Sequence, residues 1–417
     1  MISKREISQI IADQQSLGFK PDDLPRLEST FPDKEIVVIS GIRRCGKSTL
    51  LHEIRETNAE KDYYFNFDDE RLVNFQVDDF QLLYEVFIEL FGKQNTFYFD
   101  EIQNISGWER FVRRLHDYNN KVYITGSNAS MLSRELGTHL TGRYYRQELF
   151  PFSFPEFLKY KGNTLPGKTL LSTEEKVALH SKFLDYFTSG GFPAYVKSGN
   201  KQYLTSLYES IVYRDVMVRN GLTLEKEILE LVHFVASNTS RLISYNSLTK
   251  VIGVKNATTV KNYLSFLENT YLIFLVNKYD FSVKKQIHNP KKIYFIDWGL
   301  VRELGFHHSE DNGRLLENLV FIELKRRGKE IYYHSQKFEC DFVIKEKNRI
   351  VQAIQVSWSV YNPETKKREL DGLLEALSIH NLKEGLILTD DEEDELTVKD
   401  CRIKIVPVWK WLLNLGR

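Results

Sequence analysis

The sequence predicts an α/β protein whose first part is built on a parallel sheet, and three stretches carry this prediction. Residues 36–50 (IVVISGIRRCGKSTL) are typical of a strand, a glycine-bounded loop and the start of a helix. Residues 96–101 (TFYFDE) indicate a buried strand that ends in two acids. Residues 121–128 (KVYITGSN) indicate a strand that ends in small polar residues. Helices between such strands are what a parallel sheet needs to connect them.

Length and composition set the class of protein. A chain of 417 residues is long for one hydrophobic core and suggests about three domains. No stretch approaches the roughly 18 unbroken apolar residues of a membrane span, and the N-terminus has no continuous apolar segment typical of a secretion signal. Three scattered cysteines (Cys45, Cys340 and Cys401) are too few for a disulfide framework or a zinc cluster. We therefore expect a cytoplasmic protein with no membrane partner.

The charges are balanced overall but unevenly distributed. A net charge of +0 argues against a chain that coats nucleic acid through bulk electrostatics, although it leaves room for a local patch. Residues 241–292 contain nine Lys and Arg against two acids, a local balance of +7. We interpret the acidic run at 390–395 as a solvated loop.

The first residues predict a short helix, with Ile7, Ile10 and Ile11 at helical spacing, and then a connector to the glycine-bounded loop. That loop matches G-x-x-x-x-G-K-[ST] completely. Its glycines let successive amides point inward toward phosphate, and the lysine can extend to the β and γ phosphates. The residues predicted to bind ATP are Gly41, Ile42, Arg43, Arg44, Cys45, Gly46, Lys47, Ser48 and Thr49. Ser48 would also hold Mg²⁺; the plainer alternative is an ordinary glycine turn.

Residues 62–67 predict a second strand and residues 80–91 a crossover helix. The strand at 96–101 then ends in Asp100 and Glu101, whose side chains point in different directions. Asp100 can face Mg²⁺ through water, while Glu101 faces the space beyond the γ phosphate and can polarise a water molecule. In isolation the same pair could be a simple acidic turn.

A capping box at Ser106–Glu109 predicts the start of a helix whose buried face is Trp108, Phe111, Val112 and Leu115. The strand at 121–128 follows. Ligands bind at the carboxyl ends of parallel strands, so Asn128 or Ser127 could respond to the γ phosphate.

The remaining chain predicts three further regions. Residues 151–225 indicate a helical lid or connector with a glycine-rich break at 189–193. Helices at 228–237, 247–253 and 256–268, followed by strands at 272–276 and 293–296, indicate a helix-turn-helix with a wing. Its third helix would expose Lys255, Thr258, Thr259, Lys261 and Asn262, which suit phosphates and base edges. Because winged helices also bind proteins, DNA and protein partners both remain open. Residues 313–408 indicate two helices and a small mixed sheet.

Together these motifs resemble the prokaryotic AAA-type ATPases known as ATP-binding proteins. The segments that carry the resemblance are Gly41 to Ser48, Asp100-Glu101, Thr125-Gly-Ser-Asn128, Thr141-Gly-Arg143 and Phe152-Ser-Phe-Pro-Glu156. The resemblance implies that Asp100 and Glu101 are the Walker B pair and that Asn128 is similar to a sensor residue. It also implies that Arg143 is an arginine finger supplied to a neighbouring subunit of a homo-oligomer.

The same resemblance implies four domains: an AAA-type nucleotide domain at 1–150, a helical lid or connector at 151–225, a winged helix at 226–305, and a restriction-endonuclease-like domain at 306–417. Active members of the last fold carry an acid, then an acid-x-lysine on the next strand. Glu317 and Asp341 match the first part, but the second is Gln355-Val356-Ser357. A neutral amide oxygen holds Mg²⁺ poorly, and the lysine is missing. We therefore expect no nuclease activity and interpret Glu317 as a helix-surface residue and Asp341 as a strand-end acid.

The function predicted from sequence is Mg²⁺-dependent ATP binding and hydrolysis, used as a conformational switch on a nucleic-acid or protein partner. A DNA contact would run through Lys250, Lys255 and Lys261. One alternative is a DNA-binding regulator that binds nucleotide without significant turnover, and a second is an ATP-dependent nuclease. An intact Glu101 favours hydrolysis, because a pure binding module needs no base there.

Overall fold

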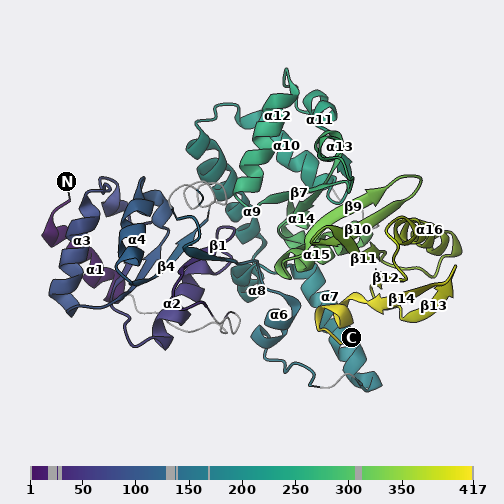
Figure 1. The fold of residues 1–417 in the computed structure, drawn as a ribbon, viewed down its shortest axis with the longest axis horizontal. Helices are drawn as coiled ribbons and strands as arrows, with labels where there is room; N and C mark the ends of the chain where they lie inside the picture. The colour runs from purple at the N-terminus through teal and green to yellow at the C-terminus, as the bar shows by residue number, and fades with distance from the viewer. Residues whose placement is uncertain are drawn as a thin grey trace. The chain divides into compact units, whose positions relative to one another are not determined.

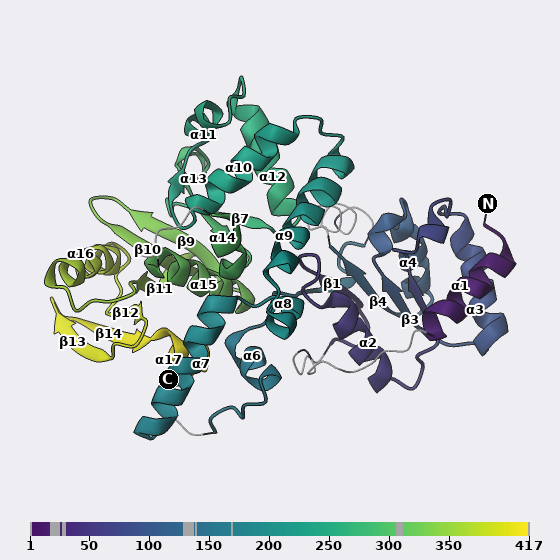
Figure 2. The ribbon, with the colours of Figure 1, turned by 180° about the vertical axis from the view of Figure 1, so that it is seen from behind.

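The computed structural model describes residues 2–16, 26, 31–127, 137, 140–167, 170–305 and 312–415. The chain divides into two compact units, Met1–Phe150 with Asn269–Tyr271, and Pro151–Glu268 with Leu272–Arg417. Figures 1 and 2 show the ribbon from two opposite sides. Across the described part of the chain, every helix is too short or too polar to cross a membrane.

The first unit contains a five-stranded sheet in the order β2-β3-β4-β1-β5, and every neighbouring pair in it is parallel. Strand β1 pairs with β4 on one side and with the edge strand β5 on the other, so Val37 lies between Tyr123 and Tyr145. The strands are β1 (Ile36–Ser40), β2 (Tyr64–Asn66), β3 (Thr96–Asp100), β4 (Lys121–Gly126) and β5 (Tyr144–Glu148). The predicted α/β class and parallel sheet are confirmed, and all five carboxyl ends meet at one edge.

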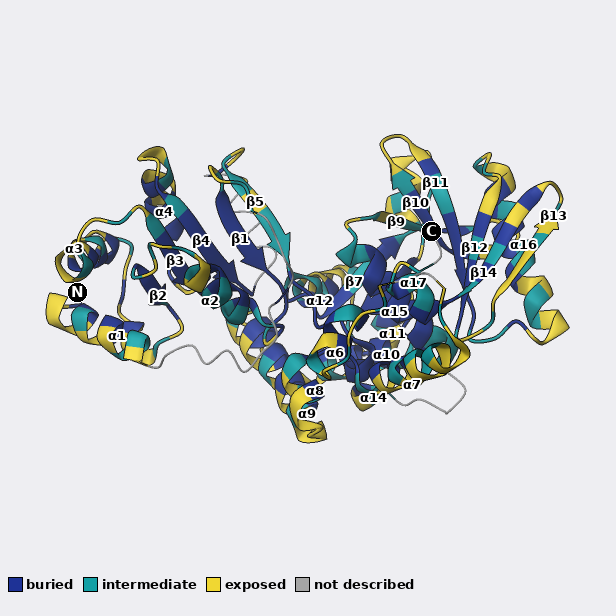
Figure 3. Cartoon of the chain, turned by 90° about the horizontal axis from the view of Figure 1, so that it is seen from below, coloured by how far each residue is buried: buried dark blue, intermediate teal, exposed yellow. Residues whose placement is uncertain are grey.

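Helices cover both faces of this sheet. Alternate strand residues, including Ile36, Phe97 and Val122, share one apolar cluster with side chains from α1, α3 and α4. Helix α2 contacts β1, β3 and β4, and its Leu50, Leu51 and Ile54 lie outside that cluster, so it covers the opposite face. Figure 3 shows β1 and β4 buried along their length and the helices exposed on their outer sides. The helices are α1 (Lys4–Ser16), α2 (Lys47–Thr57), α3 (Asp79–Phe91) and α4 (Trp108–Asp117), with short 3-10 turns η1 (Glu70–Leu72) and η2 (Ile102–Asn104).

Two details of this unit differ from the sequence analysis. Strand β5 was not predicted, because its sequence YYRQE is polar and its side chains are only partly buried at the sheet edge. Helix α4 begins at Trp108 and buries the expected face, but the capping box was wrong. Gly107 is the N-cap, with a φ of 83° that favours glycine, and no side chain caps the helix.

The second unit begins with a run of helices. The predicted glycine-rich break is real: α7 ends at Ser189, and Gly190 follows with a φ of 76°. A Cβ on Gly191 would lie 2.5 Å from the carbonyl oxygen of Phe152, so only glycine fits this close approach. The helices are α6 (Phe154–Tyr160), α7 (Thr173–Ser189), α8 (Pro193–Ser198), α9 (Lys201–Ser210) and the π-helix η3 (Ile211–Val218).

Three helices and a small antiparallel sheet come next. Helices α10 (Glu225–Ser237), α11 (Tyr245–Val251) and α12 (Ala257–Asn269) lie close to the predicted ranges. Strand β8 (Lys291–Phe295) is central in the order β6-β8-β7, with β6 (Leu242–Ile243) and β7 (Ile273–Asn277) at its sides. The β7–β8 connection contains a short helix, α13 (Val283–His288), that the sequence analysis did not predict.

The C-terminal part is a six-stranded mixed sheet in the order β13-β14-β12-β11-β10-β9. Its central pairs β11-β12 and β12-β14 are parallel, and the other pairs are antiparallel. Helix α16 packs its Leu373 and Leu377 into a core with Val343 and Ile387. The elements are α14 (Trp298–Leu304), α15 (Asn312–Arg326), β9 (Glu330–Ser335), β10 (Glu339–Glu346), β11 (Arg349–Val356), α16 (Pro363–Ile379), β12 (Glu384–Thr389), β13 (Asp394–Val398), β14 (Cys401–Pro407) and α17 (Val408–Leu412). The predicted mixed sheet is confirmed.

The acidic run at 390–395 is not a simple solvated loop. Asp390 pairs with His180 at 3.0 Å, and Asp391 accepts a hydrogen bond from the Trp409 ring nitrogen at 3.1 Å. Glu392 accepts two bonds from the backbone nitrogen of Val360, and β13 begins at Asp394. These carboxylates tie distant segments together, which a count of charges along the chain does not reveal.

Candidate functional site

The glycine-bounded loop lies between the end of β1 and the start of α2, at the carboxyl edge of the first sheet. A Cβ on Gly41 would lie 2.2 Å from the carbonyl oxygen of Leu149, so the loop can pass there only as glycine. Gly46 has a φ of 101° and precedes α2, whose first residue is Lys47. The loop thus presents the amino end of a helix, where backbone amides favour an anion.

The Lys47 ammonium is buried beneath this loop. Its Nζ donates a hydrogen bond to the Ile42 carbonyl oxygen at 3.1 Å and lies 3.7 Å from Oε1 of Glu101. Only 2 % of the Lys47 side chain is exposed. These two contacts are few for an ammonium with three donors. The lysine is therefore held in place but retains capacity to bind an anion.

Asp100 ends β3 and is almost completely buried. Its Oδ1 accepts a hydrogen bond from Thr125, and its Oδ2 lies 3.5 Å from the Tyr64 hydroxyl. Burial and then the charge of Glu101 raise the pKa of Asp100 to about 6, although hydrogen bonds from Thr125 and Ser48 oppose this. Asp100 and Ser48 are therefore neighbours, as a shared magnesium site requires.

Glu101 follows in an unusual backbone conformation. Its φ is 50°, and its backbone nitrogen donates to the Thr125 hydroxyl at 2.9 Å. Burial would raise the pKa of Glu101, but the Lys47 charge and hydrogen bonds from Gln103 and Ser127 hold it below the usual value. Glu101 is therefore ionised at neutral pH, and one fifth of its side chain is exposed. An ionised, partly exposed carboxylate can accept a proton from water.

Two side chains orient this carboxylate: Gln103, which the sequence analysis did not name, and Ser127, which it named only as a candidate to respond to the γ phosphate. Gln103 donates to Oε2 of Glu101, and Ser127 donates to the same oxygen at 3.3 Å. Thr125 meanwhile joins the two acids, since its hydroxyl donates to Asp100 and accepts from the Glu101 backbone. Gln103 lies two residues after a strand-end acid pair, and nothing in that spacing distinguishes it from an ordinary turn residue.

The other predicted site residues occupy different positions. Arg44 is exposed with a φ of 65°, Arg43 is partly exposed, and Cys45 is buried with its thiol 3.4 Å from the Leu149 carbonyl oxygen. Thr49 lies in the first turn of α2. Arg143 immediately precedes β5 and pairs with Asp117 at 3.3 Å, at the sheet edge opposite Lys47. Asn128 lies outside the described residues.

The lysines predicted to contact DNA are solvent-exposed. Lys250 lies on α11, Lys261 lies on α12, and Lys255 lies between these helices. Thr258 and Asn262 on α12 are exposed too, while Thr259 is half-buried and donates to Asn256. These side chains are available to a partner, as the sequence analysis expected.

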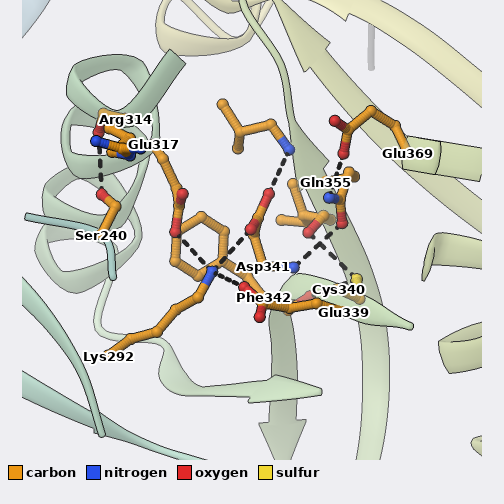
Figure 4. Close-up of polar contacts among 12 residues, drawn as sticks. Ser240, Lys292, Arg314, Glu317, Glu339, Cys340, Asp341, Phe342, Gln355 and Glu369 are labelled. Carbon is orange, nitrogen blue, oxygen red and sulfur yellow. Dashed lines mark hydrogen bonds and ion pairs between the residues drawn. The ribbon is translucent and has the colours of Figure 1, made fainter. Parts of the chain in front are cut away.

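The interpretation of Glu317 as a helix-surface residue and Asp341 as an isolated strand-end acid was wrong. Both are buried, and they converge on the ammonium of Lys292, at 2.9 and 2.8 Å (Figure 4). The two carboxylates can be buried because the Lys292 ammonium, which carries the opposite charge, lies beside them. No pattern at 290–293 indicated that Lys292 belongs to this cluster, since the three residues meet only through tertiary structure.

Sequence comparison places the chain among whole-length relatives. It is 34% identical over 436 residues to "Uncharacterized protein MJ1544" of Methanocaldococcus jannaschii, covering 99% of this chain and 97% of that one. The chain belongs to the family of this archaeal protein. An "Uncharacterized protein" of Haemophilus influenzae is 30% identical, covering 99% of this chain and 100% of that one.

Three family models match successive parts of this family member. Residues 33–158 match an AAA domain, which contains the Lys47, Asp100 and Glu101 site. Residues 180–310 match "Domain of unknown function (DUF8612)", and residues 312–411 match "Domain of unknown function (DUF4143)". The first unit is therefore an AAA domain of the P-loop ATPase class. A solved variant of RuvB from Thermotoga maritima is 14% identical, with a TM-score of 0.28 over 65% of this chain and 87% of that one. A likeness this slight carries no argument.

Proposed function

We propose that this protein binds ATP with Mg²⁺, hydrolyses it, and uses the cycle as a conformational switch on a nucleic-acid or protein partner. The observation that carries the proposal is the convergence of Lys47, Asp100 and Glu101 at the carboxyl edge of the parallel sheet. Ligands of open α/β sheets bind at this edge. The site combines an anion-binding loop, a buried acid and an ionised acid, which are the parts that phosphoryl transfer to water uses.

The residues present fit a nucleotide with Mg²⁺. The loop leads into the amino end of α2, where backbone amides favour phosphate oxygens, and Lys47 has donors to spare. Ser48 and Asp100 are the pair that would hold Mg²⁺, as the serine hydroxyl already lies against the carboxylate. Bound Mg²⁺ would neutralise the negative charge that phosphoryl transfer accumulates on the phosphate oxygens.

Glu101 then has the task of orienting the attacking water. Gln103 and Ser127 fix its Oε2, so its Oε1 faces the Lys47 side of the site. A lowered pKa keeps the carboxylate ready to accept a hydrogen bond from water. We further propose that Asn128 responds to the γ phosphate and that Arg143 acts on the site of a neighbouring subunit. The pairing of Arg143 with Asp117, away from Lys47 of its own chain, is compatible with a role in trans.

Two substitutions test the site. Lys47→Ala should weaken nucleotide binding, since the lysine binds ground-state phosphate. Glu101→Gln should bind normally and lose about 10²- to 10⁴-fold in turnover, because a general base contributes mainly in the transition state. Fluorescent-nucleotide titration and phosphate release measure the two quantities. Glu85→Gln, the same change at an exposed position of α3, is the matched control. Wild-type turnover in Glu101→Gln would refute the assignment of the base.

For the second unit we propose a helical connector at 151–225 and a winged helix at 226–305. The order of three helices with an antiparallel β6-β8-β7 sheet supports the winged helix. Exposure of Lys250, Lys255 and Lys261 favours a phosphate-backbone partner, and DNA is the partner that we propose for this surface. The alternative is a regulator that binds DNA and nucleotide without turnover. The phosphate-release measurement distinguishes the two, because such a regulator would show no turnover that Glu101→Gln could lower.

For residues 306–417 we propose a restriction-endonuclease-like domain that recognises or docks rather than cleaves. Gln355 does not offer a free oxygen for a metal ion: its Oε1 accepts from the Asp341 backbone, and its Nε2 donates to Glu369. Plasmid and linear DNA should therefore stay intact with Mg²⁺ or Mn²⁺, with or without ATP. Metal-dependent cutting that disappears in Asp341→Ala would establish the ATP-dependent nuclease instead.

A further inference from the structure

The feature that the ATP site leaves unused is the Lys292 cluster in the second unit. Lys292 lies in β8, and its Nζ is 2.9 Å from Glu317 of α15, 2.8 Å from Asp341 of β10 and 2.7 Å from Glu339 of β10 (Figure 4). Only 2 % of the lysine side chain is exposed. An ammonium has three donors, so these three carboxylates match its full capacity.

The ammonium keeps its charge in this position. Burial alone would lower the pKa of Lys292, but the charges of Asp341 and Glu317 raise it well above the usual value. Its neighbours also prevent it from swinging away. The Tyr294 hydroxyl donates to Glu317 at 2.6 Å, and Asn318 makes two hydrogen bonds to the backbone of Phe295, at 2.7 and 2.9 Å. Strand β8 and helix α15 are thus also joined by the two strand residues that follow shortly after the lysine.

Carboxylate oxygens that converge on one point are ligands that a divalent cation can bind. Here that point is occupied by Nζ at nitrogen–oxygen distances of 2.7 to 2.9 Å, about 0.7 Å longer than Mg²⁺ ligand distances and about 0.3 Å longer than Ca²⁺ ligand distances. With the carboxylates arranged around the ammonium as they are here, no three acid, His or Cys side chains among the described residues form a group that could hold a metal ion. The second oxygen of Asp341 is also committed, since it accepts from the Val356 backbone at 2.9 Å.

A metal ion from solvent is not prevented from reaching this position. The cluster borders a cavity of about 420 Å³ lined by Gly313, Glu317, Glu339, Asp341, Trp358 and Glu369. A hydrated ion can therefore reach the carboxylates from solvent. What opposes its binding is the positive charge already in place, because a divalent ion would have to share the carboxylates with Lys292 at a few ångströms.

We infer that the Lys292 ammonium is a built-in cation that fills the divalent-cation position of this carboxylate site and excludes a metal ion from it. The lysine places one permanent positive charge among Glu317, Glu339 and Asp341, and it needs no dissociable ion to do so. The site is thereby a permanent structural contact between β8, α15 and β10. Removing the ammonium should convert it into a binding site for Mn²⁺ or Mg²⁺, since the carboxylates would lose their counter-charge.

The experiment counts Mn²⁺ ions bound to the nucleotide-free full chain, by the electron paramagnetic resonance signal of free Mn²⁺. Wild type and Asp341→Asn should bind the same number, because Asp341 binds no metal while Lys292 is present. Lys292→Met should bind one ion more than wild type, and Lys292→Met with Asp341→Asn should lose that ion. Lys291→Met, in the same strand but with its Nζ on the Gln286 carbonyl oxygen, should match wild type.

Two results would overturn the inference. One is a wild-type protein that binds one more Mn²⁺ than Asp341→Asn. The other is a folded Lys292→Met protein that gains no ion. If Lys292→Met does not fold, the comparison of wild type with Asp341→Asn still tests the inference, because one additional Mn²⁺ ion in wild type would contradict it. None of these variants changes Lys47, Asp100 or Glu101, so a failed ATPase proposal would not be mistaken for a failure here.

Discussion

The two units each place a lysine among carboxylates, but with different geometry. Lys47 has a backbone carbonyl at 3.1 Å and one carboxylate at 3.7 Å, whereas Lys292 has three carboxylates at 2.7 to 2.9 Å. Both side chains are only 2 % exposed. The two lysines are therefore equally buried, and they differ in the number and distance of their partners.

This difference separates a lysine with unused donors from one whose three donors all have carboxylate partners. The ammonium in the AAA domain has capacity left for phosphate, and the carboxylate beside it is partly exposed. The ammonium in the C-terminal part has none left, so it holds elements together instead. Lysine and acid residues at a strand end are thus weak evidence of catalysis until their remaining donors are counted.

The largest effect that would sharpen this comparison concerns Arg143. If the AAA site is completed by a neighbour, Arg143→Ala should retain ATP binding and lose turnover by about 10³- to 10⁵-fold. Mixing Arg143→Ala with Lys47→Ala should restore part of the activity, because each chain supplies what the other lacks. Turnover per chain that stays constant on dilution to a demonstrated monomer would remove the trans role.

The next prediction compares how much free energy of unfolding is lost when each of the two lysines is replaced. Lys292→Ala leaves buried carboxylates without their cation and should cost about 3–5 kcal/mol. Lys47→Ala breaks one longer contact to a single, partly exposed carboxylate and one backbone hydrogen bond, so it should cost less than Lys292→Ala. Urea unfolding followed by far-ultraviolet circular dichroism suits the test, because helices of both units contribute to that signal. Equal losses in the two variants would break the comparison.

A smaller effect is expected from pH at the AAA site. The pKa of Asp100 is raised to about 6, so lowering the pH from 7 to 5 protonates it. Metal binding needs the carboxylate form, so Mg²⁺-dependent nucleotide affinity should fall about tenfold per pH unit below 6. Glu101 stays ionised over this range, because its pKa is lowered. Asp100→Asn, titrated in the same buffers, should lose this pH dependence; an unchanged slope would assign it to another group.

The smallest effect concerns the exposed lysines of α11, α12 and the turn between them. If they bind DNA, affinity should fall steeply with salt, with a log–log slope of about 0.9 for each DNA phosphate that a lysine neutralises. Reversing Lys255 and Lys261 to glutamate should reduce the slope without altering ATP turnover. Lys329→Glu, at a distant half-buried position, serves as the matched charge change. Identical DNA binding at low salt would assign this surface to a protein partner.

Much of the fold was predictable because its signals are local. The apolar runs of β1, β3 and β4 and the helical spacing of α1 and α3 lie within single segments. Strand β5 and the Gly107 cap were missed for a physical reason: an edge strand is half-exposed and polar, and a left-handed cap carries no side-chain pattern. Both the edge strand and the cap depend on the folded structure rather than on a local sequence pattern.

The candidate sites divide in the same way. Lys47, Asp100 and Glu101 each follow a recognisable strand, and the topology of a parallel sheet brings strand ends together. Gln103 could not be predicted, because its contact with Glu101 depends on a short 3-10 turn. Lys292 could not be predicted either, since it is 25 residues from Glu317 and 49 from Asp341.

The Lys292 cluster also bears on how this chain can be divided and exchanged in evolution. The lysine belongs to the segment matched at 180–310, whereas Glu317, Glu339 and Asp341 belong to the one matched at 312–411. A fragment that starts at residue 312 contains the buried acids Glu317 and Asp341, and the exposed Glu339, without the ammonium that they contact. Recombination at the border between these two matched segments would separate Lys292 from the acids that it contacts. We therefore expect the two segments to be inherited together.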